Sequence, residues 1–402
     1  MKPRRDPVLG RRGAERQAQS GAAQASHRGR TRCEEEDMPV RYRADQVGSL
    51  LRPPELLRAR ADYGEGRLSL EEFRRIEDQA IVGVLELQRQ VGLDVFTDSE
   101  YRRGAFLTDM AEAVEGFIPQ KILIEWRGPG GGPSESYSQV VGGKLRQTRR
   151  LTAHQVGFLK RHGPGPFKIT MPNPALFMFA GYKPGLTDRF YPSRSDLMKE
   201  LVSIIRGEIK ALLDEGVPYI QLDAPQYSFY VDGQARERMR QVGVDPDRVF
   251  DEAVAGDIAC LEGLRREGVT LAMHVCRGNY RSLWYAEGGY EPIAEKLFGS
   301  LPVDRFLLEY DTDRAGGFEP LRYVPDGKTV VLGLISTKQP KLESPDHLRR
   351  RIDEAAKYVP FERLALSPQC GFASGAEGNL LSMDDQRRKL ELLVDTARKV
   401  WR

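Results

Sequence analysis

Residues 271–280 read Leu271-Ala-Met-His-Val-Cys-Arg-Gly-Asn-Tyr280, an apolar run that ends in two potential metal ligands and a turn. A short apolar run bounded by a turn predicts a strand. Residues two apart on a strand point to the same face, so the imidazole of His274 and the sulfur of Cys276 should project together where the strand stops. These two side chains supply half of a metal site.

Two further ligand types follow later strands. Glu309 closes an apolar run that begins at Phe306, and Cys370 follows a run that begins at Leu364. One imidazole, two thiolates and one carboxylate form a ligand set that suits Zn2+. Each residue alone has an ordinary explanation, as a buried core side chain or a salt-bridge partner. The four together, all at strand ends, favour a metal site.

The composition describes a soluble globular protein, with 40% hydrophobic and 30% charged residues. A chain of 402 residues can hold one large barrel or two ordinary domains. The net charge of +3, without a basic patch, argues against nucleic acid as a partner. No apolar run approaches the roughly 20 residues that a membrane span requires. Four scattered cysteines argue against a disulfide framework and predict a cytoplasmic protein.

Residues 1–38 differ in composition from the rest and predict a disordered tail. They are rich in Arg, Gln, Ser, Ala and Gly and contain no apolar stretch that could act as a signal sequence. A transit peptide is the alternative, but the acidic cluster at residues 34–37 argues against it. Met38 is a candidate translation start, and residues 39–402 are expected to form a single domain.

Beyond the tail, predicted strands alternate with predicted helices. The strands lie near residues 47, 95, 148 or 169, 221, 272, 307, 332 and 366. The helices span Pro54–Arg60, Ser69–Val91, Arg194–Glu215, Pro246–Arg266, Pro292–Phe298, Pro345–Tyr358 and Met383–Trp401. This α/β alternation implies parallel pairing, and about eight strands form a (βα)8 TIM barrel. The Gly-rich and Pro-rich residues 127–137 are expected to be a flexible excursion, because the alternation resumes after them.

A doubly wound open sheet is the competing architecture. It favours a Gly-rich phosphate loop after the first strand, which Val47-Gly-Ser-Leu-Leu-Arg52 is not. In TIM barrels the active site lies at the C-terminal ends of the strands. Six candidate residues follow such ends: Ser49, Glu100, Asp223, His274, Glu309 and Cys370.

From about Tyr42 onward, the chain resembles the catalytic barrel of the cobalamin-independent methionine synthase family, in the short form that lacks the duplicate N-terminal barrel. The resemblance rests on six segments in order: Val47-Gly48-Ser49, Gly92-Leu-Asp-Val with Asp98-Ser-Glu100, Ile220-Gln-Leu-Asp223, His274-Val-Cys276, Leu308-Glu309 and Ser367-Pro-Gln-Cys370-Gly371. It implies an enzyme that transfers a methyl group to the thiol of homocysteine and forms methionine. The family's zinc ligands correspond to His274, Cys276, Glu309 and Cys370.

The resemblance also implies where homocysteine binds. Asp223 and Glu100 would bind its ammonium group, and the backbone around Val47, Gly48 and Ser49 would hold its carboxylate. A helix N-cap is the alternative role for Asp223, and a salt bridge with Arg102 or Arg103 is the alternative for Glu100. These alternatives remain open from the sequence.

The segments that contact methylfolate in the family differ in this chain. Asp223 is followed by Ala224-Pro225 rather than Glu-Pro, and residues 169–174 contain no Trp. Residues 143–146 lack an Arg-Cys pair, and residues 336–338 lack a His. The methyl donor is therefore either methylfolate or a methyl-corrinoid protein, and another thiol such as coenzyme M is the alternative acceptor. A sulfonate thiol would require cations, for which the candidates are Arg52, Arg102 and Arg277.

Overall fold

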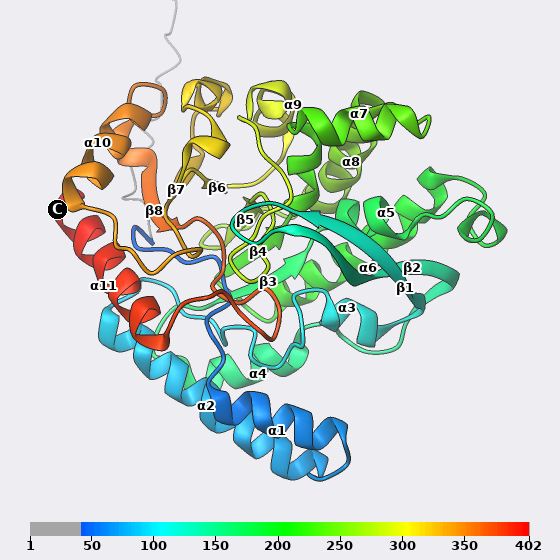
Figure 1. Ribbon diagram of the computed structural model, residues 1–402, viewed down its shortest axis with the longest axis horizontal. Helices are drawn as coiled ribbons and strands as arrows, with labels where there is room; N and C mark the ends of the chain where they lie inside the picture. Colours follow the sequence, from blue (N-terminus) through cyan, green and yellow to red (C-terminus); the bar gives the residue numbers. More distant parts are fainter. Residues whose placement is uncertain (1–41, 402) are drawn as a thin grey trace, which may run out of the picture. The chain divides into compact units, whose positions relative to one another are not determined.

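Six parallel strands form one sheet, in sequence order, in the computed structural model, which describes residues 42–401 (Figure 1). The strands are β3 (Lys168–Pro172), β4 (Tyr219–Asp223), β5 (Thr270–Val275), β6 (Arg305–Glu309), β7 (Thr329–Ile335) and β8 (Leu364–Pro368). They confirm the α/β class and the strands predicted near residues 169, 221, 272, 307, 332 and 366. The predicted disordered tail, residues 1–38, lies outside the described residues.

Helices connect successive strands and pack against one face of the sheet (Figure 1). The predicted helices are found as α1 (Pro54–Gly64), α2 (Leu70–Val91), α6 (Arg194–Asp214), α8 (Pro246–Leu261), α9 (Glu291–Ser300), α10 (Pro345–Ala355) and α11 (Met383–Val400). Four more were not predicted: α3 (Thr108–Ala113), α4 (Ala153–His162), α5 (Pro174–Gly181) and α7 (Gly233–Gln241). Side-chain caps explain why several of these helices start where predicted. At α2 the Ser69 hydroxyl accepts a hydrogen bond from the Glu72 amide, and the Glu72 carboxylate accepts one from the Ser69 amide.

The predicted strands near residues 47 and 95 are each reduced to an isolated bridge. Ala44 pairs with Leu366 of β8, and Phe96 pairs with Phe167 beside β3. The amide of Asp94 also donates to the Ala44 carbonyl at 3.2 Å, so the two segments contact each other. These two segments form no longer strand because side chains accept hydrogen bonds from nearby backbone amides. For example, the Asp94 carboxylate accepts from the Ala44 amide.

Side chains on the two faces of the sheet belong to two separate apolar clusters. The larger cluster lies between the sheet and the helices and includes Ile220, Met273 and Leu308. The smaller one combines alternate residues of these strands with three residues of the preceding segments, and it comprises Tyr42, Val47, Val95, Tyr219, Ala272, Leu307, Val331 and Ala365. Because side chains alternate along a strand, this second cluster lies on the face away from the helices.

A buried charge cluster joins the first described segment to the sheet on the same face. The Asp45 carboxylate accepts from Lys168 at 2.9 Å, from Arg305 at 2.9 Å and from the Tyr219 hydroxyl at 2.8 Å. All four side chains are at most 4% exposed. One buried carboxylate thus holds the segment around residue 45 against β3, β4 and β6.

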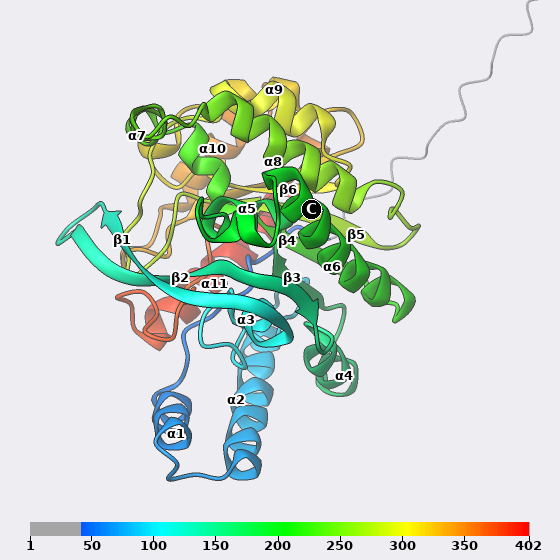
Figure 2. The same ribbon diagram turned by 90° about the vertical axis from the view of Figure 1, so that its right-hand side faces the viewer.

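Residues 114–147 form a long antiparallel hairpin, which corrects the expected excursion at residues 127–137. Its strands are β1 (Val114–Trp126) and β2 (Gly132–Gln147), and the Gly-rich residues make the turn between them. In Figure 2 the hairpin extends beyond the parallel sheet as a two-stranded arm. The other candidate for the third strand, near residue 148, is therefore the end of this hairpin. None of the helices in residues 42–401 combines the length and apolar character needed to cross a bilayer.

Candidate active site

His274, Cys276 and Cys370 come together at the C-terminal ends of β5 and β8. Their ligand atoms all lie within 4.8 Å of one another. The three residues are 3%, 4% and 5% exposed, so the group is shielded from solvent. Both cysteines are free thiols. One imidazole and two sulfurs at this spacing can hold a metal ion.

The ring of His274 is oriented for metal binding. Its Nδ1 lies 3.2 Å from the carbonyl oxygen of Leu307, which can only accept, so Nδ1 carries the proton. Its Nε2 is buried and has no hydrogen-bond partner among the described residues. A buried nitrogen without a partner is rare, and a metal ion would satisfy it.

The two sulfurs differ in their affinity for a proton. The pKa of Cys276 lies well below its usual range because the Cys370 thiol donates a hydrogen bond to it and the nearby charge of His274 favours the thiolate. Donating that bond, together with burial, raises the pKa of Cys370 well above its usual value. One thiolate is therefore already favoured within the group.

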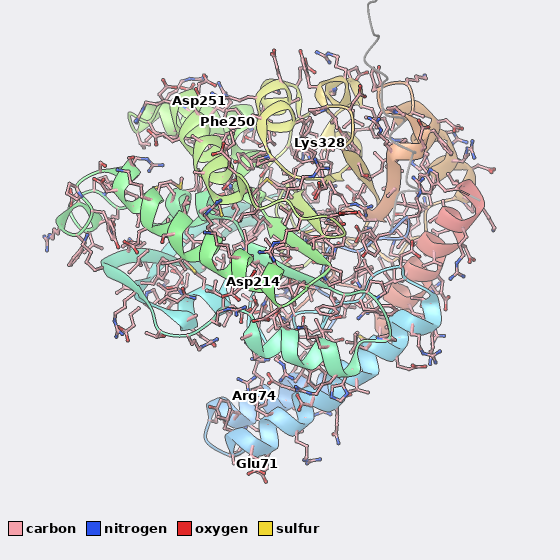
Figure 3. All side chains as sticks on the ribbon, turned by 180° about the vertical axis from the view of Figure 1, so that it is seen from behind. Glu71, Arg74, Asp214, Phe250, Asp251 and Lys328 are labelled. Carbon is pink, nitrogen blue, oxygen red and sulfur yellow. The ribbon has the colours of Figure 1, made fainter. Side chains whose placement is uncertain are left out.

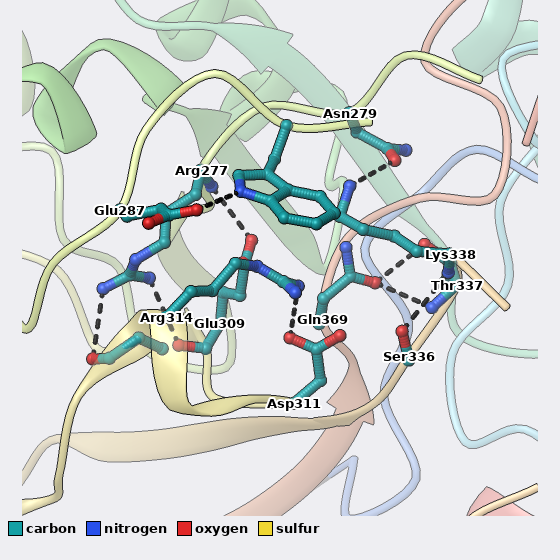
Figure 4. Close-up of polar contacts among 12 residues, drawn as sticks. Arg277, Asn279, Glu287, Glu309, Asp311, Arg314, Ser336, Thr337, Lys338 and Gln369 are labelled. Carbon is teal, nitrogen blue, oxygen red and sulfur yellow. Dashed lines mark hydrogen bonds and ion pairs between the residues drawn. The ribbon is translucent and has the colours of Figure 1, made fainter. Parts of the chain in front are cut away.

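Glu309 lies at the end of β6 but outside this group. Its Oε1 is 2.8 Å from Nε of Arg314, and its Oε2 accepts from the Arg277 amide at 2.9 Å. Figure 4 shows Arg314 between Glu309 and Asp311. Burial opposes ionisation of Glu309, but Arg314 and Arg277 keep its pKa below the usual value. Its role as a metal ligand stays a prediction.

The segment Val47–Ser49 lies between Glu100 and the group of His274, Cys276 and Cys370, called the metal group below. A Cβ atom on Gly371, the residue after Cys370, would lie 2.0 Å from the Ser49 Oγ. A Cβ on Gly48 would lie 3.2 Å from Oε1 of Glu100. The amides of Gly48 and Ser49 donate no hydrogen bond to any residue between 42 and 401. This backbone therefore presents two unpaired N–H groups next to the candidate site.

Asp223 and Glu100 each offer one uncommitted carboxylate oxygen. Oδ1 of Asp223 accepts from Gln221 at 2.8 Å, and Oε1 of Glu100 accepts from Thr170 at 2.9 Å. In the part of the chain that the structure describes, no hydrogen bond reaches Oδ2 of Asp223 or Oε2 of Glu100. Burial raises the pKa of Asp223 to about 7; His274 opposes this, and the nearby charge of Glu100 adds to it.

The structure excludes the alternative role of Asp223 as a helix N-cap and shows the alternative salt bridge of Glu100. The short helix after Asp223, η2 (Pro225–Tyr230), begins after Ala224 and receives no side-chain cap, so Asp223 is not an N-cap. The alternative for Glu100 is present, because Arg103 lies 3.3 Å from its Oε1. This ion pair leaves Oε2 of Glu100 available.

Three polar residues around the carboxylates were not predicted as site residues. Gln221 donates both to Asp223 and to the Val47 carbonyl, at 2.8 and 2.6 Å. Gln221 and Thr170 lie on the inner face of predicted strands, so strand alternation could have identified them. Arg103 lies in an irregular loop, where no periodic pattern points to it.

Aromatic rings line one side of the group. Phe229 and Tyr285 stack with their centroids 4.6 Å apart, and Trp126 at the end of β1 lies 5.7 Å from Tyr285. The amide of Arg127 donates to the carbonyl of Trp284 at 2.6 Å, which fixes the hairpin to the loop that follows β5. The hairpin therefore helps to form this side of the site.

A groove lies on the outer helical layer. The groove of about 460 Å³ between α8 and α9 is lined by Phe250, Asp251 and Lys296, among others. Figure 3 labels Phe250 and Asp251 on α8. Lys296 pairs with Asp251 at 2.5 Å, and the lining also contains Asp247, Glu291 and Glu295. None of the candidate site residues lines this groove.

Comparison with protein families and with known sequences gives consistent matches. Residues 44–149 and 173–399 match the family described as cobalamin-independent synthase, catalytic domain. The uncharacterized protein YxjH of Bacillus subtilis is 38% identical over 370 residues, which cover 90% of this chain and 95% of the relative. A methionine synthase of Saccharolobus solfataricus is 24% identical over 355 residues, covering 88% of this chain and 93% of the relative.

Solved structures show the same fold. A putative vitamin-B12 independent methionine synthase from Listeria monocytogenes is 28% identical, with a TM-score of 0.68 over 91% of this chain and 99% of that chain. A B12-independent methionine synthase from Shewanella is 22% identical, with a TM-score of 0.69 over 90% of this chain and 98% of that chain. The chain belongs to the cobalamin-independent methionine synthase family, whose catalytic domain it carries, and is a methyltransferase of that family.

Proposed function

We propose that this protein is a zinc-dependent methyltransferase that transfers a methyl group to the thiol of homocysteine and forms methionine. One observation carries the proposal. Two buried carboxylates, Asp223 and Glu100, each keep one oxygen free beside a buried group of one imidazole and two sulfurs. This arrangement suits a small molecule that has an ammonium group at one end and a thiol at the other.

His274, Cys276 and Cys370 would hold the zinc ion, and Glu309 is the proposed fourth ligand. The unpaired Nε2 of His274 and the low pKa of Cys276 fit a soft, thiolate-binding metal. Bound zinc would supply a site at which a substrate thiol is deprotonated at neutral pH. Burial of the three residues keeps water away from the reacting sulfur.

The amino-acid end of homocysteine would lie between Asp223, Glu100 and the segment Val47–Ser49. Two ionised carboxylates close together in a buried site repel each other, and an ammonium group between them relieves that repulsion. The unpaired amides of Gly48 and Ser49 can donate to the substrate carboxylate. The chain's own groups thus match the charges of the substrate at both positions.

A sulfonate thiol such as coenzyme M fits this site less well. The three candidate cations are already committed: Arg52 donates to the carbonyls of Ala373 and Glu100, and Arg277 to those of Gly288 and Glu309. Arg102 pairs with Asp78 at 2.5 Å. The sulfonate would also be repelled by the carboxylates of Asp223 and Glu100.

Three further features belong to the proposal. The methyl donor is methylfolate or a methyl-corrinoid protein. The segments around residues 44 and 96 close the six strands into an eight-stranded TIM barrel, supported by their hydrogen bonds to β8 and β3. The free thiols of the three cysteines in the described part of the chain favour a reducing compartment such as the cytoplasm.

Isothermal titration of the zinc-loaded protein tests the function. Homocysteine should bind and release about one proton, whereas coenzyme M should bind weakly. Asp223→Asn should weaken homocysteine binding without loss of zinc. Asp304→Asn, which changes a carboxylate beside the opposite end of β6, is the matched control. Binding of coenzyme M without binding of homocysteine would refute the proposal in favour of another thiol.

A further inference from the structure

Arg103 sits in the loop between residues 98 and 107 and is 1% exposed. Its Nε donates to Asp109 at 2.6 Å, and its Nη2 donates to the Thr170 carbonyl at 2.6 Å and to Gln155 at 3.0 Å. Its Nη1 donates to the Thr170 hydroxyl at 3.1 Å and lies 3.3 Å from Oε1 of Glu100. The guanidinium is therefore fixed on all sides, with one edge toward Glu100.

Arg103 supplies positive charge to a strongly acidic region. Burial acts against its charged form, yet the pKa of Arg103 is raised by four carboxylates, Asp109, Glu100, Asp98 and Asp223. These carboxylates are buried, with at most 7% exposure. Without a cation, such a group of acids takes up protons or moves apart. Arg103 therefore places a fixed positive charge 3.3 Å from Oε1 of Glu100.

The loop also constrains the direction of the Glu100 side chain. Glu100 has φ of 59°, a left-handed conformation that is uncommon for residues other than glycine. Arg52 donates to the carbonyls of Glu100 and Arg103 at 3.0 and 2.9 Å, which holds this conformation. The Thr170 hydroxyl accepts from Arg103 and donates to Oε1 of Glu100. Both the Thr170 hydroxyl and Nη1 of Arg103 contact Oε1 of Glu100, which leaves Oε2 free.

We propose that Arg103 is a positioning residue that holds the Glu100 carboxylate in place and directs its free oxygen toward the ammonium group of the substrate. The proposal rests on the function proposed above. A purely structural Arg103 would anchor the loop to β3 and Asp109 without affecting the choice of ligand. The two roles differ in one measurable quantity, the preference for a thiol that carries an amino group.

The test compares homocysteine with 4-mercaptobutanoate, which has the same thiol and carboxylate but no amino group. The zinc-loaded wild-type protein should bind homocysteine about 10- to 100-fold more tightly, the range expected for hydrogen bonds to charged groups. Arg103→Met should reduce this ratio several-fold, to the part of the preference that Asp223 supplies, while affinity for 4-mercaptobutanoate and zinc content stay unchanged. Arg103→Lys should retain more of the preference, because a lysine keeps the charge but not the planar fork.

Arg102→Met is the matched control. Arg102 is a neighbouring arginine with 7% side-chain exposure, but it points to Asp78 and Glu77, away from Glu100. The Arg102→Met variant should keep the wild-type ratio of affinities for homocysteine and 4-mercaptobutanoate. Thr170→Val removes the bond to Glu100 while Arg103 stays in place, so it carries the test if Arg103→Met does not fold.

The outcomes are distinct. A wild-type ratio in both Arg103→Met and Thr170→Val would overturn the positioning role. An equal loss of affinity for both thiols in Arg103→Met would also overturn it and show a structural role. A wild-type protein that does not distinguish the two thiols would refute the proposed function itself.

Discussion

Asp257 offers a quantitative test of the packing behind the candidate active site. It lies on α8 with 0% exposure, and its Oδ2 accepts from Asn173 at 2.6 Å and from the Tyr227 hydroxyl at 2.7 Å. Asn173 follows β3, and Tyr227 belongs to η2, the helix that follows Asp223. Burial raises the pKa of Asp257 from 3.8 to about 7, with these hydrogen bonds opposing it.

The direction of the pH effect follows from this pKa. The folded protein binds the Asp257 proton more tightly than the unfolded chain does. The contribution of this proton to the free energy of unfolding is therefore fully present at acidic pH. It is lost as the pH rises through about 7. The full difference corresponds to about 4 kcal/mol in the free energy of unfolding. From about pH 5 to about pH 8, the loss should amount to about 2.5 kcal/mol.

Asp257→Asn removes this titration while keeping nearly the same shape. Urea unfolding of both proteins across this pH range gives the difference in free energy of unfolding at each pH. We expect that difference to shift in favour of the variant by about 2.5 kcal/mol as the pH rises. Asp247→Asn, at an exposed carboxylate on the same helix, should show no comparable shift. A pH-independent difference for Asp257→Asn would refute the reasoning.

Three other substitutions test the group of His274, Cys276 and Cys370, the parallel sheet, and the segment Val47–Ser49. Cys370→Ser should remove most of the bound zinc, measured by elemental analysis, while the circular dichroism spectrum stays unchanged. Asp45→Ala leaves buried cations without their carboxylate and should lower the free energy of unfolding by about 3–5 kcal/mol in urea. Gly48→Ala adds a Cβ 2.9 Å from Thr170 and 3.2 Å from Glu100. It should weaken homocysteine binding in calorimetry without loss of zinc.

Each of these substitutions has a contradicting result. Full zinc content in Cys370→Ser would remove that residue from the ligand set. An unfolding free energy within about 0.5 kcal/mol of wild type in Asp45→Ala would show that the charge cluster does not hold the sheet. Loss of zinc in Gly48→Ala would mean that the substrate segment supports the metal group rather than the substrate.

The parallel sheet was predictable because each strand is short, apolar and followed by a polar residue. The same alternation placed His274 and Cys276 on one face, and the structure brings them to Cys370. The hairpin was not predictable in the same way. Its strands pair only with each other, and its Gly-rich turn looks like any irregular loop in a sequence.

The roles of Glu309 and Arg103 depend on contacts that sequence patterns do not encode. Glu309 ends a strand as predicted, but its carboxylate pairs with Arg314, five residues later, in the short 3-10 helix η3 (Asp313–Ala315). Arg103 reaches Thr170 and Gln155, more than fifty residues away, from a loop with no regular period. Such pairings follow from tertiary packing, so a single sequence does not reveal them.

The bridge between Ala44 and Leu366 has a consequence for how the protein is made. The segment that lies against the metal group, Val47–Ser49, leaves the ribosome hundreds of residues before Cys370 does. A nascent chain that stops before β8 can pair its middle strands, but it lacks both the second thiol and the strand on which the first segment rests. Metal binding by the complete group of His274, Cys276 and Cys370 would therefore require that translation has passed the last strand. An interrupted product would contain only His274 and Cys276 of this group.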